Sequence, residues 1–228
     1  MTVTSIASVT LVRFSPHDGD HVRTAELVEC YREVFADTPW HEWLKCPQCQ
    51  QYWGKKDGGV LVTTKFRHCG TPLVDFWSRE QVVSDLYQEI TPSASCWLAL
   101  HASSVVGFCF GYAISVTDLE KKLAIQFSRK LAENGGGVVA YQDEVGVLTA
   151  FRGCKIAKAM FANRLEDFLA SGLRTGIVRT REFPEPSQTF LWYTEKLGYK
   201  ILARYPGDDG RVILGREFKG LKELLASS

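Results

Sequence analysis

The stretch "DEVGVLTAFRGCKIAKAMFANRLEDFL", residues 143–169, decides the fold of this chain. Its first part favours an apolar β-strand, and its second part places Ile156, Met160 and Leu165 at helical spacing. A short basic turn with Gly153 lies between the two. A strand that runs directly into a helix leaves backbone N–H groups free at the helix N-terminus, and these groups favour a bound anion. The stretch therefore predicts a phosphate-binding turn, with a basic strand-to-helix turn that binds nothing as the alternative.

The same reading extends outward along the chain. Period-two and helical patterns alternate, and in the second half strands and helices follow one another, which indicates a mixed α/β (α+β) sheet with helices on both faces. The expected strands are 9–14, 96–102, 105–116, 138–151, 175–181, 200–205 and 211–218, and the expected helices are 21–35, 78–90, 117–134, 155–172 and 187–198.

Residues 45–74 interrupt this order with a turn-rich segment, in which an Asp-Gly-Gly run suggests a hairpin between short strands. A C-x-x-C pair precedes a second group of metal-binding residue types, and a structural zinc site needs four N or S donors. So short a segment with few core-forming side chains also favours a metal. The predicted Zn²⁺ ligands are Cys46, Cys49, His68 and Cys69.

The fourth ligand is the least determined by the sequence. A second C-x-x-C would place a cysteine where Phe66 stands, so one donor is displaced. His68 is the nearest replacement, with His41 or Cys30 as alternatives. A ribbon that has lost its metal and a redox-active pair are the competing interpretations. The redox interpretation is weaker because this C-x-x-C does not open a helix after a strand.

Residues 143–169 resemble the acetyl-CoA-binding motif of the GNAT superfamily of N-acetyltransferases, in which a strand ends in a [Q/R]-x-x-G-x-[G/A] turn. Arg152 and Ala157 match the ends of that motif, and Lys155 replaces its middle glycine. The segment "SQTFLWYTEKLGYKILARY", residues 187–205, is similar to the family's A-x-x-F/L-Y-x-x-L-G-F helix and the strand after it.

The resemblance implies one GNAT-like domain over residues 1–228, with a mostly antiparallel sheet, splayed central parallel strands and a zinc-ribbon-like β subdomain inserted at 45–74. It further implies that acetyl-CoA lies between the splayed strands, with its pyrophosphate on the turn. The residues that the resemblance assigns to the cofactor are Val145, Val147, Arg152, Gly153, Cys154, Lys155, Ile156, Ala157 and Lys158.

Acyl transfer from a thioester to an amine needs a base, an oxyanion donor and an acid for the thiolate. The resemblance implies Glu144 as the base and Tyr193 as the acid, with a backbone N–H near Val145 or Val147 for the oxyanion. Asp143 is the alternative base. Because side chains alternate along a strand, we expect only one of the two carboxylates on a given face.

The expected function is transfer of an acetyl group from acetyl-CoA to a primary amine of a small molecule or peptide, by direct attack. The alternative is a catalytically inactive GNAT-fold module that binds CoA, or engages a protein through its ribbon. Lys155 favours this alternative, as does the lack of the asparagine that the family often has before its tyrosine.

Bulk properties exclude several classes. The chain has 228 residues and a formal net charge of +1, which does not favour nucleic acid as a partner. It contains no apolar run of membrane-spanning length, and its first residues lack the pattern of a signal peptide. We therefore expect a cytoplasmic enzyme with neither a membrane nor a nucleic-acid partner. A homodimer is left open.

Overall fold

The computed structural model describes residues 9–131, 137–183, 187–207 and 210–218. The chain divides into two compact units. The first consists of Met1–Glu89, Trp97–Cys109 and Val145–Met160, and the second consists of Ile90–Cys96, Phe110–Glu144 and Phe161–Ser228.

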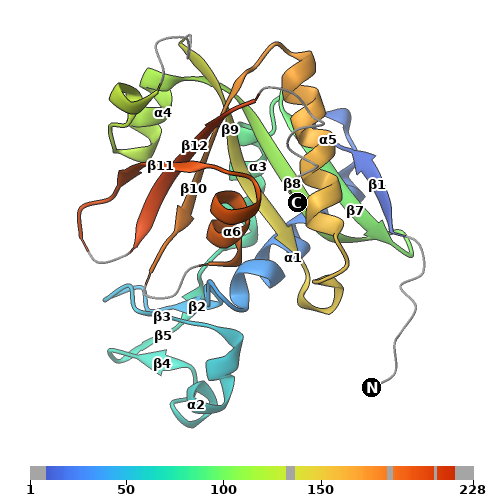
Figure 1. The fold of residues 1–228 in the computed structure, drawn as a ribbon. Coiled ribbons are helices and arrows are strands. Elements are labelled where there is room, and N and C mark those ends of the chain that lie inside the picture. The colour runs from blue at the N-terminus through green and yellow to red at the C-terminus, as the bar shows by residue number, and fades with distance from the viewer. Residues whose placement is uncertain (1–8, 132–136, 184–186, 208–209, 219–228) are drawn as a thin grey trace. The chain divides into compact units, whose positions relative to one another are not determined.

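A seven-stranded sheet confirms the mixed, mostly antiparallel architecture, and Figure 1 shows its long strand β9 between β8 and β10. The antiparallel pairs include β1 with β7, β10 with β12 and β11 with β12. In sheet order the strands are β1 (Thr10–Arg13), β7 (Ser95–His101), β8 (Ser104–Ser115), β9 (Val138–Val147), β10 (Thr175–Arg181), β12 (Arg211–Glu217) and β11 (Lys200–Arg204).

The parallel pair β9 and β10 separates early. Its register consists of Ala140 opposite Gly176 and Tyr141 opposite Ile177. β9 continues to Val147 beyond this short contact. The splay of the central parallel strands, which was expected from the family resemblance, is therefore present.

Within the described residues, five α-helices accompany the sheet, and polar side chains cap several of them. The Asp20 carboxylate accepts from the Arg23 N–H at the start of α1, as N-cap residues commonly do. None of the helices in the described part of the chain has the length and apolar character that a membrane crossing requires. Their bounds are α1 (His21–Ala36), α3 (Arg79–Glu89), α4 (Val116–Leu123), α5 (Ile156–Ala170) and α6 (Gln188–Leu191).

The prediction of one helix over 117–134 was wrong. α4 ends at Leu123, and Ala124 takes a left-handed conformation with φ 52°. Phe127 then packs into the same apolar cluster as Leu119 and Leu123 from outside the helix. Burial of this aromatic ring therefore overrides the helical pattern, and residues 132–134 lie outside the described part of the chain.

Each unit has its own apolar core. In the first unit, the cluster joins strands β7 and β8 to the first turns of α5 through Ala99, Val106, Cys109, Val147, Ile156 and Met160. In the second unit, one cluster is built on the later turns of α5 together with Tyr193 and Tyr199, and another on α4.

The inserted segment contains two small sheets. One has the order β3 (Tyr52–Trp53), β2 (Leu44–Lys45) and β6 (Val74–Asp75), and the other pairs β4 (Arg67–His68) with β5 (Thr71–Pro72). The hairpin expected at Asp-Gly-Gly was wrong, because a short helix, α2 (Gly58–Thr63), begins there. The Asp57 carboxylate accepts from the Gly54 N–H just before α2, so this side chain supports a helical turn instead.

Candidate active site and cysteine cluster

The turn between β9 and α5 lies in the first unit. The Leu148 N–H donates to the Val106 carbonyl at 2.9 Å, a 3-10 turn follows over Thr149–Phe151, and α5 begins at Ile156. Lys155 has a φ of 61°, in the left-handed region that favours glycine. The lysine therefore keeps the backbone conformation that a glycine would adopt with less strain, while its exposed side chain adds a positive charge.

Arg152 holds this turn through backbone carbonyls. Its Nε donates to the Val147 carbonyl at 3.1 Å, and its Nη1 donates to the Thr38 carbonyl at 2.8 Å. The Thr149 hydroxyl donates to Asp37 Oδ2 at 2.6 Å. This bond is the largest cause that lowers the pKa of Asp37, followed by the Thr38 N–H. The loop after α1 is thus connected to the turn at two points.

The other residues assigned to the cofactor occupy mixed surroundings. Gly153 has a φ of 80°, and the Cys154 thiol is half-buried, with its Sγ 3.5 Å from the Arg152 carbonyl oxygen. Ala157 and Val145 are half-buried beside the apolar cluster of the first unit, Val147 and Ile156 belong to that cluster, and Lys158 is half-buried. Their contacts with a cofactor stay predictions.

Strand β9 contains one extra residue relative to β8. A Cβ added to Gly107 would lie 3.0 Å from the Gly146 oxygen, and one added to Gly111 would lie 2.3 Å from the Tyr141 oxygen. The direction of this pairing is antiparallel, and four steps along β8 correspond to five along β9. Such a two-against-one mismatch is a β-bulge, a feature that occurs often next to active sites.

The faces of β9 support the same conclusion. Ala140 packs with Phe161 and Leu165 of α5, and Val147 also packs with residues of α5. Positions 140 and 147 would lie on opposite faces of a regular strand, because side chains alternate. The alternation is therefore broken once between them.

Asp143 and Glu144 both act electrostatically on Tyr141 and Arg179, and the expectation that only one of the two carboxylates lies on a given face stays a prediction. Asp143 Oδ2 accepts from the Tyr112 hydroxyl at 3.1 Å and from Lys122 Nζ at 3.2 Å, and its side chain is 5% exposed. Glu144 is half-buried, and its backbone carbonyl accepts a hydrogen bond from Arg164.

Tyr193 lies in the second unit with none of its surface exposed. Its hydroxyl donates to Gln142 Oε1 at 3.0 Å and accepts from Arg164 Nη2 at 3.0 Å. Three residues separate Tyr193 from Leu197, where the family pattern has two. A π-helical turn over Trp192–Lys196 accommodates the additional residue, because its hydrogen bonds span one residue more than those of an α-helix.

The helix N-terminus before Tyr193 is capped by Ser187. Its Oγ accepts from the Phe190 N–H at 3.0 Å and lies 2.9 Å from Thr180 Oγ1. The side chain of Ser187 therefore stabilises the start of α6.

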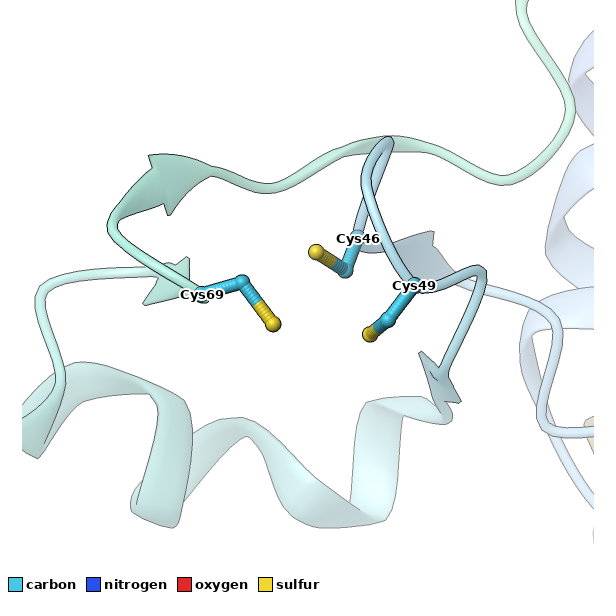
Figure 2. Close-up of side chains that lie close together, drawn as sticks. All are labelled: Cys46, Cys49 and Cys69. Atoms are coloured by element: carbon cyan, nitrogen blue, oxygen red, sulfur yellow. The ribbon is translucent and has the colours of Figure 1, made fainter.

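The predicted metal ligands come together in part. Figure 2 shows the thiols of Cys46, Cys49 and Cys69 directed toward a common space, and their sulfur atoms all lie within 4.8 Å of one another. Three thiols at this separation are a donor set that fits Zn²⁺ or another thiophilic ion.

Cys46 is the buried member of this group. Burial raises the pKa of its thiol, but hydrogen bonds from the backbone N–H groups of Cys49 and Gln48 outweigh burial and lower that pKa to about 7. The Cys49 thiol is the largest cause that raises the pKa of Cys69, to about 11. The Cys46 thiol therefore ionises near neutral pH. The backbone N–H groups that lower its pKa belong to the C-x-x-C loop, which would also hold the metal.

His68 does not join the three cysteines in this structure. Its ring packs edge-on against Trp53 at a centroid distance of 5.0 Å, because adjacent side chains in the β4–β5 turn diverge. The alternatives also lie elsewhere: Cys30 is buried in α1, where burial raises its pKa to about 12, and His41 is not part of the group. Phe66, at the position of the missing cysteine, packs edge-on against Trp43.

Two functional candidates were missed by sequence reasoning. Arg164 and Gln142 are buried and bonded to each other and to Tyr193. One signal was present: Arg164 follows Met160 by four residues and precedes Phe168 by four, so helical periodicity places this charge on the apolar face of α5.

No protein-family model and no curated protein matches the chain. Solved structures do. The PaiA N-acetyltransferase of Thermoplasma acidophilum in complex with coenzyme A is 13% identical, with a TM-score of 0.54 over 93% of this chain and 100% of that one. Arabidopsis thaliana NAA60 in complex with acetyl-CoA is 12% identical, with a TM-score of 0.53 over 93% and 100%.

An aminoglycoside 6'-acetyltransferase of type Ii is 14% identical, with a TM-score of 0.51 over 91% of this chain and 96% of that one. These likenesses agree with the sheet order, the early separation of β9 from β10 and the turn into α5. The chain has the fold of the GNAT N-acetyltransferases.

Proposed function

We propose that the chain is an acetyl-CoA-dependent N-acetyltransferase that acts on a primary amine. The observation that carries this proposal is the early separation of β9 from β10, followed directly by the turn into α5. In a GNAT fold this arrangement exposes strand backbone for the pantetheine arm and helix N–H groups for the pyrophosphate. Two of the three similar structures are named as acetyltransferases, and two of the three were solved with coenzyme A or acetyl-CoA.

In the proposed mechanism, acetyl-CoA supplies a thioester that an amine attacks. Glu144 removes the proton from the amine, and a backbone N–H of Val145 or Val147 stabilises the oxyanion. Glu144 is preferred over Asp143 because the latter is already held by Lys122 and Tyr112. The amine acceptor belongs to a small molecule or a peptide.

Tyr193 is the proposed acid for the CoA thiolate. The Arg164 guanidinium donates to its hydroxyl and so fixes the position of the phenol. The hydroxyl is buried, so in this role the sulfur of CoA has to come within hydrogen-bond distance of it.

That burial favours a second candidate function, an inactive module that binds CoA. Calorimetric titration with acetyl-CoA and a thiol-release assay over a panel of amines separate the two. The enzyme binds acetyl-CoA and releases thiol with at least one amine. The inactive module binds acetyl-CoA and turns over none of them, and absence of binding at millimolar acetyl-CoA contradicts both.

The Lys155→Gly variant is expected to bind acetyl-CoA about threefold to tenfold more weakly, the effect of one lost charge-assisted contact at an exposed site. The backbone at Lys155 already has the φ of 61° that a glycine accepts, so the substitution removes charge and leaves the turn in place. Calorimetric titration measures the change.

Two matched variants separate the effect of the lysine charge on acetyl-CoA binding from the effect of the backbone conformation. Asparagine tolerates the left-handed region and is neutral, so Lys155→Asn should weaken binding like Lys155→Gly. Lys155→Arg keeps the charge and should bind as the parent chain does. Tighter binding by Lys155→Gly would show instead that the lysine crowds the cofactor.

We also propose that Cys46, Cys49 and Cys69 bind a structural zinc ion that stabilises the inserted segment. The chemistry of three converging thiols supports this proposal. His68 as fourth ligand requires its ring to leave Trp53, so we propose a fourth ligand other than His68.

Freshly purified protein is expected to contain about one equivalent of zinc, and Cys69→Ser should lose it because two thiols do not complete a tetrahedral site. His68→Ala should retain the metal, since its ring lies outside the cysteine group. Elemental analysis measures both. Loss of zinc in His68→Ala would restore His68 as a ligand, and less than half an equivalent in the parent protein would contradict the site.

A further inference from the structure

Helix α5 carries a buried arginine. Arg164 has 1% of its surface exposed, and it is the largest fully buried side chain in the described part of the chain. A guanidinium keeps its charge in a protein, and its burial costs free energy unless hydrogen-bond acceptors surround it. The groups that Arg164 contacts therefore indicate what the residue is for.

One terminal nitrogen of Arg164 donates to two backbone carbonyls. Its Nη1 donates to the carbonyl of Phe110 in β8 at 2.8 Å and to the carbonyl of Glu144 in β9 at 3.0 Å. Glu144 lies within the bulged part of β9, between Tyr141 and Gly146. A bulge disturbs the hydrogen bonding of the ladder locally, and Arg164 supplies a donor at that place.

The other terminal nitrogen of Arg164 donates to two side chains. Nη2 donates to Gln142 Oε1 at 3.0 Å and to the Tyr193 hydroxyl at 3.0 Å, while that hydroxyl donates to the same Gln142 oxygen. Gln142 Nε2 donates in turn to the Tyr199 hydroxyl. One planar group thus contacts the backbone of the proposed base and the hydroxyl of the proposed acid, all within the second unit.

We propose that Arg164 is a positioning residue for acyl transfer, which fixes Glu144 through its backbone and Tyr193 through its hydroxyl. The inference rests on the proposed function. A lysine carries a single nitrogen and does not reproduce the fork that reaches four oxygens. A displacement of about 1 Å in a catalytic group costs on the order of 100-fold in rate.

The Arg164→Lys variant is expected to lose about 100-fold in kcat. Its KM for acetyl-CoA should stay within about twofold of the parent value, because the turn assigned to the pyrophosphate is held by Arg152. Steady-state kinetics with acetyl-CoA and an active amine from the panel give both values. Replacement of a residue that only supports the fold would not lower kcat while it leaves KM unchanged.

Ser95→Ala is the matched control. It removes the hydrogen bond of 2.6 Å from Ser95 Oγ to Asp167 Oδ2 on the same helix. It should lower the unfolding midpoint and leave kcat near the parent value.

A double variant tests whether Arg164 acts through Tyr193. Arg164→Lys with Tyr193→Phe should lose little more kcat than Arg164→Lys alone, because coupled residues are not additive. Fully multiplicative losses would overturn the connection. If circular dichroism finds Arg164→Lys unfolded, Gln142→Met replaces it and should lower kcat at least about tenfold at unchanged KM, as misplacement of a catalytic group predicts.

The outcomes are distinguishable. Parent protein that binds acetyl-CoA without turning over any amine would overturn the proposed function, and this inference with it. Active parent protein together with a folded Arg164→Lys or Gln142→Met variant of unchanged kcat would overturn this inference alone.

Discussion

Replacement of Glu144 by glutamine is expected to lower kcat by about 100-fold to 10,000-fold, the range that a positioned general base contributes. Glutamine keeps the size of the side chain and its backbone hydrogen bond to Arg164, and it removes only the ability to take a proton. The thiol-release assay with acetyl-CoA and an active amine measures the loss, while calorimetric titration should find acetyl-CoA affinity close to that of the parent protein.

Asp143→Asn is the matched control, since it neutralises the neighbouring carboxylate. That variant loses the ion pair with Lys122, so the protein should unfold at lower urea concentration while it retains most of its kcat. If Asp143→Asn is inactive and Glu144→Gln is active, the base has been assigned to the wrong carboxylate. Because both carboxylates act electrostatically on Tyr141 and Arg179, the comparison of the two variants is informative.

Replacement of Gly111 by alanine is expected to destabilise the protein by about 3 kcal/mol, at the upper end of what overpacking usually costs. The added Cβ would lie 2.3 Å from the Tyr141 oxygen and 3.1 Å from a ring atom of Phe168. The first neighbour is backbone, so strands β8 and β9 have to separate to admit the methyl group. Urea unfolding followed by circular dichroism measures the free energy.

Gly59→Ala serves as the control for Gly111→Ala. A Cβ at Gly59 meets nothing within 4 Å, and this glycine lies in the short helix α2. Alanine there should leave the free energy of unfolding unchanged or raise it by up to about 1 kcal/mol. Alanine lowers the conformational entropy of the unfolded chain and has a higher helix propensity than glycine. Equal losses in the two variants would contradict the packing argument.

The order of strands and helices was predictable because burial imposes a period of two or of 3.6 on the sequence. α5 and β10 agree with the predicted ranges within one or two residues. α4 does not, because Ala124 in a left-handed conformation and the burial of Phe127 depend on tertiary contacts. No residue between 124 and 127 resembles a helix stop signal in the sequence.

The candidate site was predictable only as far as its motif extends. The turn at Arg152–Ala157 was located from its spacing, but the bulge in β9 was not, because one extra residue in a strand leaves a sequence that still looks extended. The convergence of Cys46, Cys49 and Cys69 followed from their knuckle pattern. The position of His68 did not follow from sequence, because it depends on which way one of two adjacent side chains turns.

The two contacts between the loop after α1 and the turn before α5 also set where the chain can be cut and rejoined. Asp37 and Thr38 hold Thr149 and Arg152, so they belong with the turn rather than with the cysteine-bearing segment that follows. Farther along, Trp77 Nε1 donates to Glu42 Oε2 at 2.8 Å. This hydrogen bond joins the two ends of the cysteine-bearing segment, and we call this pair of residues its neck. A minimal chain without the segment should therefore be joined between 42 and 77, and a graft of the segment onto another scaffold should begin and end at the same neck.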